Sequence, residues 1–244
     1  SVLDSNRKKA HNDYGYSAYV KYPFLRSGYW HAGLGLKYIQ SFDNVYQKPL
    51  TVTLNMGNTK QYGISQYPNS HHELSLFAST DRGGMLYGAS YALMHDIVNQ
   101  SYVGFNTKYI KSDRGNISIK KGISINQNGY KPLSAPNSME IFSLEEDYYA
   151  KEAMMAEVGL YKVFDGSIYF FSFPLSVQRE SLYVKQRYYQ TRSKETKHLK
   201  YHESIIGLSM DLLIYHDMTF PLNIEWVHNT DAEDQDRFRV IFTY

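Results

Sequence analysis

The sequence of 244 residues contains no cysteine, and its charges nearly cancel, with 26 lysine and arginine side chains against 24 aspartate and glutamate side chains. The absence of cysteine excludes a disulfide framework and thiolate metal sites, and it leaves the redox compartment open. A formal net charge of +2 removes the electrostatic argument for a nucleic-acid-binding protein. We therefore expect no nucleic-acid partner.

The chain also lacks long apolar runs. No segment approaches the roughly 18–20 apolar residues that a membrane-spanning helix needs. The first residues show no basic region followed by an apolar region, so no signal peptide is predicted. We interpret Ser1 as a cut end, either a mature terminus or an artificial boundary.

What the sequence has in abundance is tyrosine, with 24 residues, and alternation of apolar with polar side chains. In the segments 206–214 and 218–226, every second residue is apolar. Strict alternation over about 8–11 residues predicts half-buried strands rather than helices. Its repetition at short spacing along the chain predicts an antiparallel meander.

The alternation predicts fourteen strands, with twelve as the alternative because the third and the eighth are weak. The seventh is also imperfect, because Lys121 shares its apolar face with Ile117 and Ile119. The predicted ranges are 14–25, 29–40, 49–57, 71–80, 84–95, 101–112, 115–126, 138–147, 152–163, 167–178, 181–191, 201–214, 218–229 and 235–244.

We predict that residues 14–244 form an all-β, antiparallel up-and-down transmembrane β-barrel. Strands of about 10–12 residues exceed the usual 5–6 residues and match the length that crosses a bilayer at a tilt. Long connections near 58–70, 127–137 and 192–200 are expected at one end of the barrel, with tight turns at the other. By strand parity both chain ends lie on the tight-turn side, so residues 1–13 are predicted to be a periplasmic tail, a plug or a linker stub. A soluble β-sandwich, with its apolar face turned inward, is the alternative.

The last ten residues place apolar or aromatic side chains at every second position, at Phe238, Val240, Phe242 and Tyr244. This pattern resembles the C-terminal assembly signal of bacterial outer-membrane β-barrel proteins, whose last strand ends in an aromatic residue. The resemblance implies a location in the bacterial outer membrane and recognition of this end by the barrel-assembly machinery. It also implies that the last strand closes the barrel against the first. The resemblance in strand pattern covers residues 14–244. It identifies the superfamily and no subfamily within it.

The C-terminal strands have a predictable register. If residues 230–234 form the last loop, residues of the last two strands face each other when their numbers sum to about 464. This places Glu225 opposite Arg239 and Trp226 opposite Phe238. The preceding turn places Gly207 opposite Glu225, where it leaves room for that side chain. The charged pair is expected to face the lumen, and the aromatic pair is expected to face lipid.

Eleven charged residues are expected in the lumen, and most of them are basic. One interpretation is a lining that selects anions. The other, which we favour, is a solvated or salt-bridged interior that fills a barrel of moderate width. The residues are Lys21, Lys37, Lys108, Lys120, Glu157, Lys185, Arg187, Asp211, Glu225, Arg237 and Arg239.

Two histidines are candidates for catalysis. By the alternation, His202, Ser204, His228 and Thr230 point toward lipid. The His202–Ser204 spacing is similar to that of outer-membrane phospholipases and lipid A deacylases, in which an imidazole activates a serine hydroxyl. The Ser-Asn-Gly context and a matching asparagine are absent, and Thr230 takes the place of a serine beside His228.

No metal site and no cofactor are predicted. His71, His72 and Glu73 are consecutive, but neighbouring residues of a strand point to opposite faces, so only a loop could bring all three together. Glycine-rich phosphate loops, paired acids at defined spacing and nucleophile elbows are absent from the sequence. A non-enzymatic protein is therefore expected.

Three functions remain open at this point. The leading hypothesis is a non-enzymatic outer-membrane barrel that anchors, or makes a path for, something else, such as the C-terminal domain of a longer protein. The alternatives are a stand-alone, porin-like diffusion channel and a barrel-wall lipid hydrolase. The expected partners are outer-membrane lipids, lipopolysaccharide, the barrel-assembly machinery and an attached or partner soluble domain.

Overall fold

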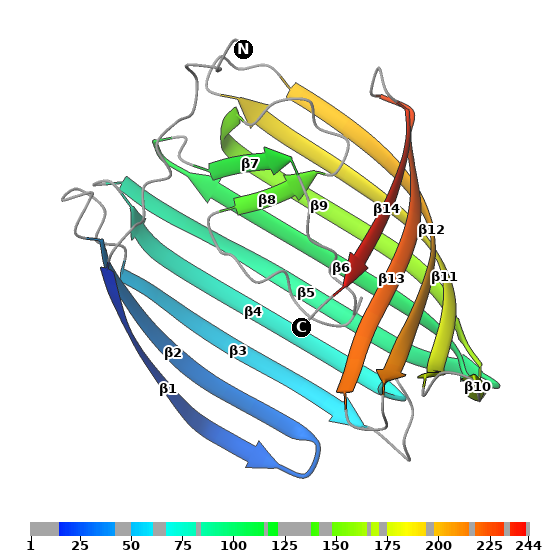
Figure 1. Ribbon diagram of the computed structural model, residues 1–244. Helices are drawn as coiled ribbons and strands as arrows, with labels where there is room; N and C mark the ends of the chain where they lie inside the picture. Colours follow the sequence, from blue (N-terminus) through cyan, green and yellow to red (C-terminus); the bar gives the residue numbers. More distant parts are fainter. Residues whose placement is uncertain are drawn as a thin grey trace.

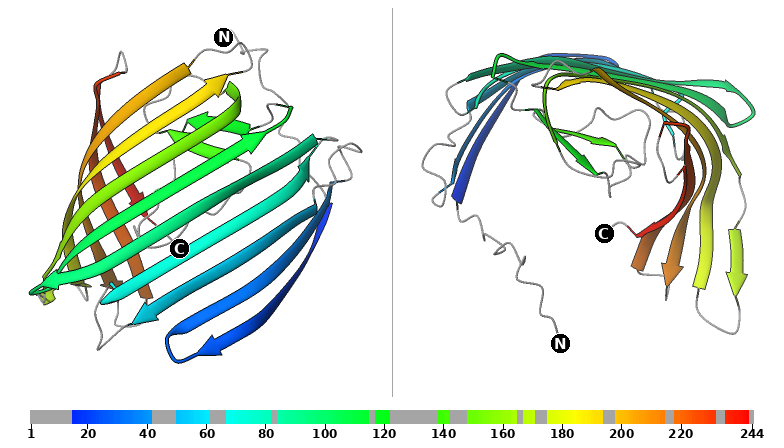
Figure 2. Two further views of the ribbon diagram at one scale, coloured as in Figure 1. Left: turned by 180° about the vertical axis from the view of Figure 1, so that it is seen from behind. Right: turned by 90° about the horizontal axis from the view of Figure 1, so that it is seen from above.

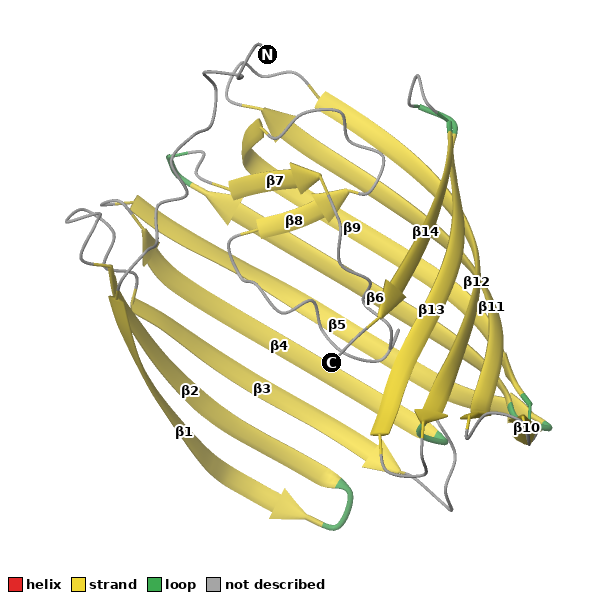
Figure 3. Cartoon of the chain, in the orientation of Figure 1, coloured by secondary structure: helices red, strands yellow, loops and turns green. Residues whose placement is uncertain are grey.

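The computed structural model describes most of the chain, and every element in the described part is a β-strand (Figure 3). The described residues are 15–41, 50–60, 67–81, 84–114, 117–121, 138–141, 148–164, 167–170, 175–193, 198–214, 218–231 and 235–242. Within these ranges, no helix is long and apolar enough to cross a membrane.

Eleven antiparallel strands follow one another in a single up-and-down sheet (Figure 1). All-β structure and antiparallel up-and-down topology are therefore confirmed. In order across the sheet the strands are β1 (Gly15–Ser27), β2 (Trp30–Ser41), β3 (Leu50–Lys60), β4 (Ser70–Asp81), β5 (Gly84–Val98), β6 (Ser101–Ser112), β9 (Tyr148–Val163), β11 (Leu175–Ser193), β12 (His198–Ile214), β13 (Met218–Asn229) and β14 (Asp236–Phe242).

Three short strands lie off this path: β7 (Ile117–Lys121), β8 (Ser138–Ile141) and β10 (Ser167–Phe170). β7 pairs in parallel with β8 and antiparallel with the first residues of β9, whereas β10 pairs with the beginning of β11. The structure therefore does not confirm a meander of fourteen spanning strands.

One expected turn is instead a bulge. The end of the predicted strand 167–178 and the whole of 181–191 lie in one continuous strand, β11, whose pairing with β12 shifts between Gln178 and Ser181, whereas residues 167–170 form β10. Arg179, at the shift, has a φ of 53°. An extra residue in a strand interrupts the alternation as a turn would, so the sequence pattern does not distinguish the two.

The sheet is strongly curved, and β7 and β8 lie inside the curve (Figure 2). β1 and β14 are the two ends of the path, and the pairings among the described residues do not join them. Because eleven is odd, β1 and β14 run in the same direction. The start of β1 and the end of β14 therefore lie at opposite ends of the sheet, which differs from the strand parity predicted from the sequence; residues 1–14, 243 and 244 lie outside the described part of the chain.

The expected one-sided arrangement of long connections is also wrong. The connection 61–69 follows β3 at the end of the sheet where β1 finishes, whereas 194–197 follows β11 at the opposite end. The miscount arose because β7 and β8 leave the meander and β11 absorbs an expected turn. The loss of β7 and β8 together lowers the count by two and leaves the direction of later strands unchanged, whereas the merged turn in β11 reverses the direction assigned to every strand from 181–191 onward.

The two faces of the sheet differ in polarity. The concave face, here called the inner face, carries buried polar and charged side chains beside buried apolar clusters, whereas the convex or outer face carries many apolar side chains that are exposed. A soluble sandwich would bury its apolar face instead. Exposed outer side chains include Val20, Tyr22, Leu34, Leu36, Val52, Leu76, Tyr87, Val158, Leu160, Leu182, Val184, Ile206, Trp226, Phe238 and Val240.

An apolar cluster fills part of the inner face beneath β7 and β8. Ile117 and Ile119, predicted to face lipid, are instead 0% exposed. They pack with Phe77, Leu86 and Ile110 of the main sheet. The prediction failed because an inward-folded segment shows the same alternation as a spanning strand, and only its packing partners distinguish the two.

Candidate functional site

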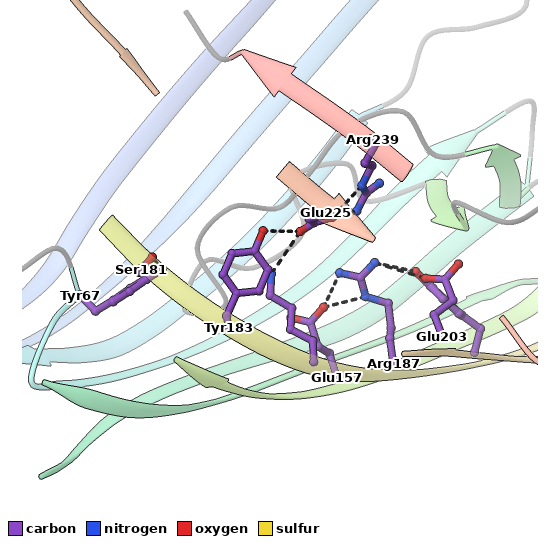
Figure 4. Close-up of polar contacts among 10 residues, drawn as sticks. Tyr67, Glu157, Ser181, Tyr183, Arg187, Glu203, Glu225 and Arg239 are labelled. Atoms are coloured by element: carbon purple, nitrogen blue, oxygen red, sulfur yellow. Dashed lines mark hydrogen bonds and ion pairs between the residues drawn. The ribbon is translucent and has the colours of Figure 1, made fainter. Parts of the chain in front are cut away.

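Charged side chains from five neighbouring strands form a buried network on the inner face (Figure 4). The six residues of this network, here called the inner charge network, are Glu157 of β9, Lys185 and Arg187 of β11, Glu203 of β12, Glu225 of β13 and Arg239 of β14. Three are cations and three are carboxylates, so their formal charges cancel.

Arg187 links two carboxylates of the inner charge network. Its Nε donates to Oε2 of Glu157 at 2.6 Å, and a second guanidinium nitrogen forms an ion pair with the same oxygen. Its Nη1 lies 3.5 Å from Oε2 of Glu203. Both glutamates are direct register partners of Arg187 on the adjacent strands. The planar guanidinium suits this arrangement, because its donors point toward both neighbours.

Glu225 is the second centre of the network. Arg239 Nε donates to its Oε2 at 2.6 Å, and the Tyr183 hydroxyl donates to its Oε1 at 2.6 Å. Lys185 Nζ lies 4.0 Å from the same Oε1. The predicted pairing of Glu225 with Arg239, and of Trp226 with Phe238, is confirmed by the register of β13 and β14. The inward orientation of the charged pair is confirmed as well.

Gly207 makes room for the Tyr183 ring. It lies between Tyr183 and Glu225 in the register, as predicted for its pairing with Glu225. A Cβ atom at Gly207 would lie 2.2 Å from Tyr183 Cζ, which is closer than atoms can approach. The space predicted for Glu225 is therefore occupied by a tyrosine that reaches across Gly207 to hydrogen-bond that carboxylate.

Further tyrosines extend the network into an aromatic group. The ring centroids of Tyr161 and Tyr183 are 5.7 Å apart, and Tyr67 packs on Tyr161 at 5.2 Å and on Tyr102 at 5.4 Å. Lys185 Nζ lies 4.3 Å from the centroid of Tyr183, in cation–π geometry. Lys185 is thus held by two aromatic faces and a carboxylate.

The charged side chains of the inner charge network are buried, which limits the role that the network can have. Lys185 and Glu203 are 0% exposed, and Glu225 is 1% exposed. Buried charges are costly to desolvate and are best tolerated when each is paired and hydrogen-bonded. Arg187 and Arg239 meet both conditions, whereas Lys185 Nζ has an ion-pair partner and two aromatic neighbours but no hydrogen bond among the described residues. The network therefore fills the inner face at this level and fixes the relative positions of β9 and β11–β14, which favours the salt-bridged interior over an anion-selecting lining.

The other predicted lumen charges have different surroundings. Lys21 and Lys37 are exposed near the β1 edge, and Asp211 forms an ion pair with the exposed side chain of Arg179. Arg237 lies on the inner face opposite Val227. Lys108 is buried on the same face, and the side chain of Lys120 lies outside the described residues.

Sequence reasoning missed Glu203 and the inward tyrosines. Glu203 lies between His202 and Ser204, so their outward orientation already implies that it points inward. The inward orientation of Tyr161 and Tyr183 was implied in the same way, because they share the phase of Glu157 and Lys185 on their strands. Which rings meet depends on segments that are far apart in sequence, as with Tyr67 and Tyr161, whose ring centroids are 5.2 Å apart.

The predicted catalytic pair, His202 and Ser204, lies on the outer face, and each of the two side chains is hydrogen-bonded to a different residue. His202 Nδ1 lies 2.7 Å from Oδ2 of Asp231, which also accepts a hydrogen bond from the His202 backbone N–H. The Ser204 hydroxyl donates to Oε1 of Gln186 at 3.0 Å. A carboxylate that orients an imidazole is thus present, although the sequence showed no matching asparagine.

The consecutive residues at 71–73 divide between the two faces, as strand geometry predicts. His71 is buried, with Nδ1 2.8 Å from the Thr59 hydroxyl and Nε2 3.5 Å from Oε2 of Glu73. On the other face, Nδ1 of His72 lies 2.9 Å from the Tyr91 hydroxyl.

The C-terminal pattern is described only in part. Phe238 and Val240 are exposed on the outer face, on the same side as Trp226. Phe242 is the last residue of β14, and its side chain lies outside the described residues, as does Tyr244 altogether. The assembly signal stays a prediction.

A comparison of the chain with models of protein families gives no match, and a comparison with curated proteins gives none either.

Proposed function

We propose that residues 14–244 form the wall of a β-barrel in the bacterial outer membrane, and that this barrel is a membrane anchor with a filled interior. The observation that carries the proposal is the polarity of the two faces, with apolar side chains exposed outside and charges buried inside. Burying apolar surface is worth roughly 25 cal/mol per Å². A convex face of this composition is therefore costly in water and favourable against lipid.

The same proposal includes closure of the sheet into a complete barrel. An open strand edge in hydrocarbon leaves backbone groups unsatisfied, at a cost of several kcal/mol each. Because β1 and β14 run in the same direction, closure takes either a parallel β1–β14 pair or an odd number of additional strands between them. A single additional strand gives the twelve strands of the alternative count.

The inner charge network supports an anchor rather than an open channel. Its ionised groups neutralise one another and are shielded from solvent, whereas a conducting pore presents charges to water. Together with the inward β7 and β8, it occupies the inner face. In planar bilayers we expect no steady conductance, and stable selective currents would instead support the channel alternative. The barrel-assembly machinery, outer-membrane lipids and lipopolysaccharide, and an attached soluble domain are the partners of this proposal.

Brominated lipids test the membrane location directly. The only tryptophans of the sequence, Trp30 and Trp226, lie on the outer face with 59% and 40% of their surface exposed. In vesicles of acyl-brominated phosphatidylcholine, we expect strong quenching of tryptophan fluorescence compared with unbrominated vesicles.

Single-tryptophan variants provide the control for this measurement. Trp226→Phe and Trp30→Phe should each retain lipid quenching of the remaining tryptophan. Heat-modifiable gel migration should accompany it, as expected for a folded barrel. Tryptophans that aqueous acrylamide quenches and brominated lipid does not would overturn the proposal.

Replacing Tyr244 with aspartate is expected to reduce barrel assembly in cells several-fold, with little change in the stability of the refolded protein. One interfacial residue contributes little to a large sheet, whereas a recognition signal is read at this end. The measurement compares outer-membrane levels with the urea midpoint of refolded protein. Tyr244→Phe should assemble normally, and normal levels of Tyr244→Asp would contradict the signal while leaving the barrel intact.

A further inference from the structure

Four polar residues form one continuous row across the outer face, which reaches the end of β13 and the first residue of β14. Gln186 of β11 is the register partner of Ser204 of β12, and Ser204 is the partner of His228 of β13. His228 is in turn the partner of Asp236 of β14. Directly opposed residues on one face of a sheet have Cβ atoms about 4.5–5.5 Å apart. Serine, histidine and aspartate are therefore adjacent, in that order.

The imidazole of His228 is already oriented by a carboxylate. Its Nδ1 lies 2.8 Å from Oδ1 of Asp236. Asp236 and Ser204 are the register partners of His228 on its two sides, and because Nδ1 engages Asp236, Nε2 is the ring nitrogen that remains for the serine. A serine, a base and a carboxylate that holds the base are the three roles of a hydrolytic triad, which is recognised by geometry rather than by sequence order.

We propose that Ser204, His228 and Asp236 are the nucleophile, the base and the orienting acid of an esterase site on the outer face. Ser204 Oγ attacks the ester carbonyl carbon while its proton passes to His228 Nε2, and Asp236 stabilises the resulting imidazolium. The C–O bond then breaks, and the alcohol leaves with that proton. Water, with His228 again as the base, hydrolyses the acyl-serine to a carboxylic acid and restores the serine.

Gln186 completes the arrangement on the other side of the serine. In the present arrangement its Oε1 accepts a hydrogen bond from Ser204 Oγ at 3.0 Å, so the hydroxyl turns toward His228 by rotation about a single side-chain bond before reaction. The same amide carries an NH₂ group beside the nucleophile. Side-chain amides can donate to the oxyanion that forms on the carbonyl oxygen. Gln186 is therefore the oxyanion donor of this site.

The surroundings indicate an ester of a membrane lipid as the substrate. Ile206 and Phe238 lie next to Ser204 and Asp236 on the same face and are exposed, so an acyl chain can pack along them. The ring of Trp226 is stacked with that of His228, with centroids 5.8 Å apart. This choice of substrate rests on the proposed membrane location, whereas the triad itself does not.

A second imidazole–carboxylate pair makes the assignment testable. His202, which is paired with Asp231, lies two residues before Ser204 on the same strand, and its ring packs on Tyr188 at 4.9 Å. His228 is therefore the base, because it is the register partner of Ser204 on the adjacent strand. Replacement of each histidine separately therefore distinguishes the two.

The experiment uses the full chain refolded in detergent micelles. A fluorophosphonate probe should label Ser204, as located by mass spectrometry of the digested protein, and 4-nitrophenyl esters should be hydrolysed. Ser204→Ala should abolish labelling and lower kcat/KM for the esters to background. His228→Ala and Asp236→Asn should each lower it by about 10³–10⁴-fold. Gln186→Ala should lower kcat by about 10²–10³-fold.

His72→Ala is the matched control, because His72 is an outer-face imidazole bonded to a tyrosine rather than a carboxylate. It should leave labelling and hydrolysis unchanged, as should His202→Ala.

Correctly folded protein in which Ser204 is not labelled, or which loses activity with His202→Ala but not with His228→Ala, would overturn the proposal. Preference for palmitate over butyrate esters supports the lipid substrate. Labelling of Ser204 together with absent brominated-lipid quenching would overturn the barrel and its lipid substrate but retain the triad.

Discussion

Replacing Glu225 with alanine is expected to lower the free energy of unfolding by about 3–5 kcal/mol. The variant removes the carboxylate that Arg239, Lys185 and the Tyr183 hydroxyl share, and it leaves two cations in a region shielded from water. An uncompensated buried charge is among the most destabilising single changes in a protein. Urea unfolding in lipid vesicles, followed by the shift of tryptophan fluorescence, measures the change.

The ion pair of Asp211 provides the control for the Glu225 prediction. Its partner, Arg179, has 52% of its side chain exposed, so water can replace the lost carboxylate. Asp211→Ala should therefore cost only about 0–1 kcal/mol. Arg239→Ala in the Glu225→Ala background should cost less than Arg239→Ala alone. Additive effects of these two variants, or an unchanged urea midpoint for Glu225→Ala, would contradict the role assigned to the network.

Replacing Gly207 with alanine should also destabilise the sheet strongly, although it adds a single methyl group. The new Cβ would lie 2.2 Å from Tyr183 Cζ, so the ring must leave its position and release Glu225. Overpacking costs about 1–3 kcal/mol, and a lost hydrogen bond to a charged group costs about 1.5–3 kcal/mol. The same unfolding measurement reports the sum.

A second substitution tests whether the collision with the Tyr183 ring explains the effect of Gly207→Ala. Tyr183→Ala removes the ring with which the methyl group collides, so Gly207→Ala should be nearly neutral in that background. The coupling free energy between the two positions should therefore be large. Independent, additive effects would show that Gly207 is needed for another reason, such as the backbone of β12.

The local pattern of the chain determined the strands and much of the register. Period-two alternation predicted β12 and β13 closely, and turn arithmetic paired Glu225 with Arg239 and Trp226 with Phe238, because a tight connection fixes which residues oppose each other. It also placed Ser204 and His228 on one face. These features depend only on neighbours along the chain or across a single turn.

Tertiary structure decided what alternation leaves open. Ile117 and Ile119 alternate as a spanning strand does, yet they pack inside the curve, because the same period fits any strand with one apolar side. The strand count, the joining of β11 across its bulge and the directions of β1 and β14 followed from such long-range choices. The row from Ser204 to Asp236 and the contacts of Glu203 and Tyr183 required several strands to align. The sequence by itself thus determined the strands and their two faces, since alternation is local, whereas the networks on those faces were decided by pairings between distant segments, which no local pattern encodes.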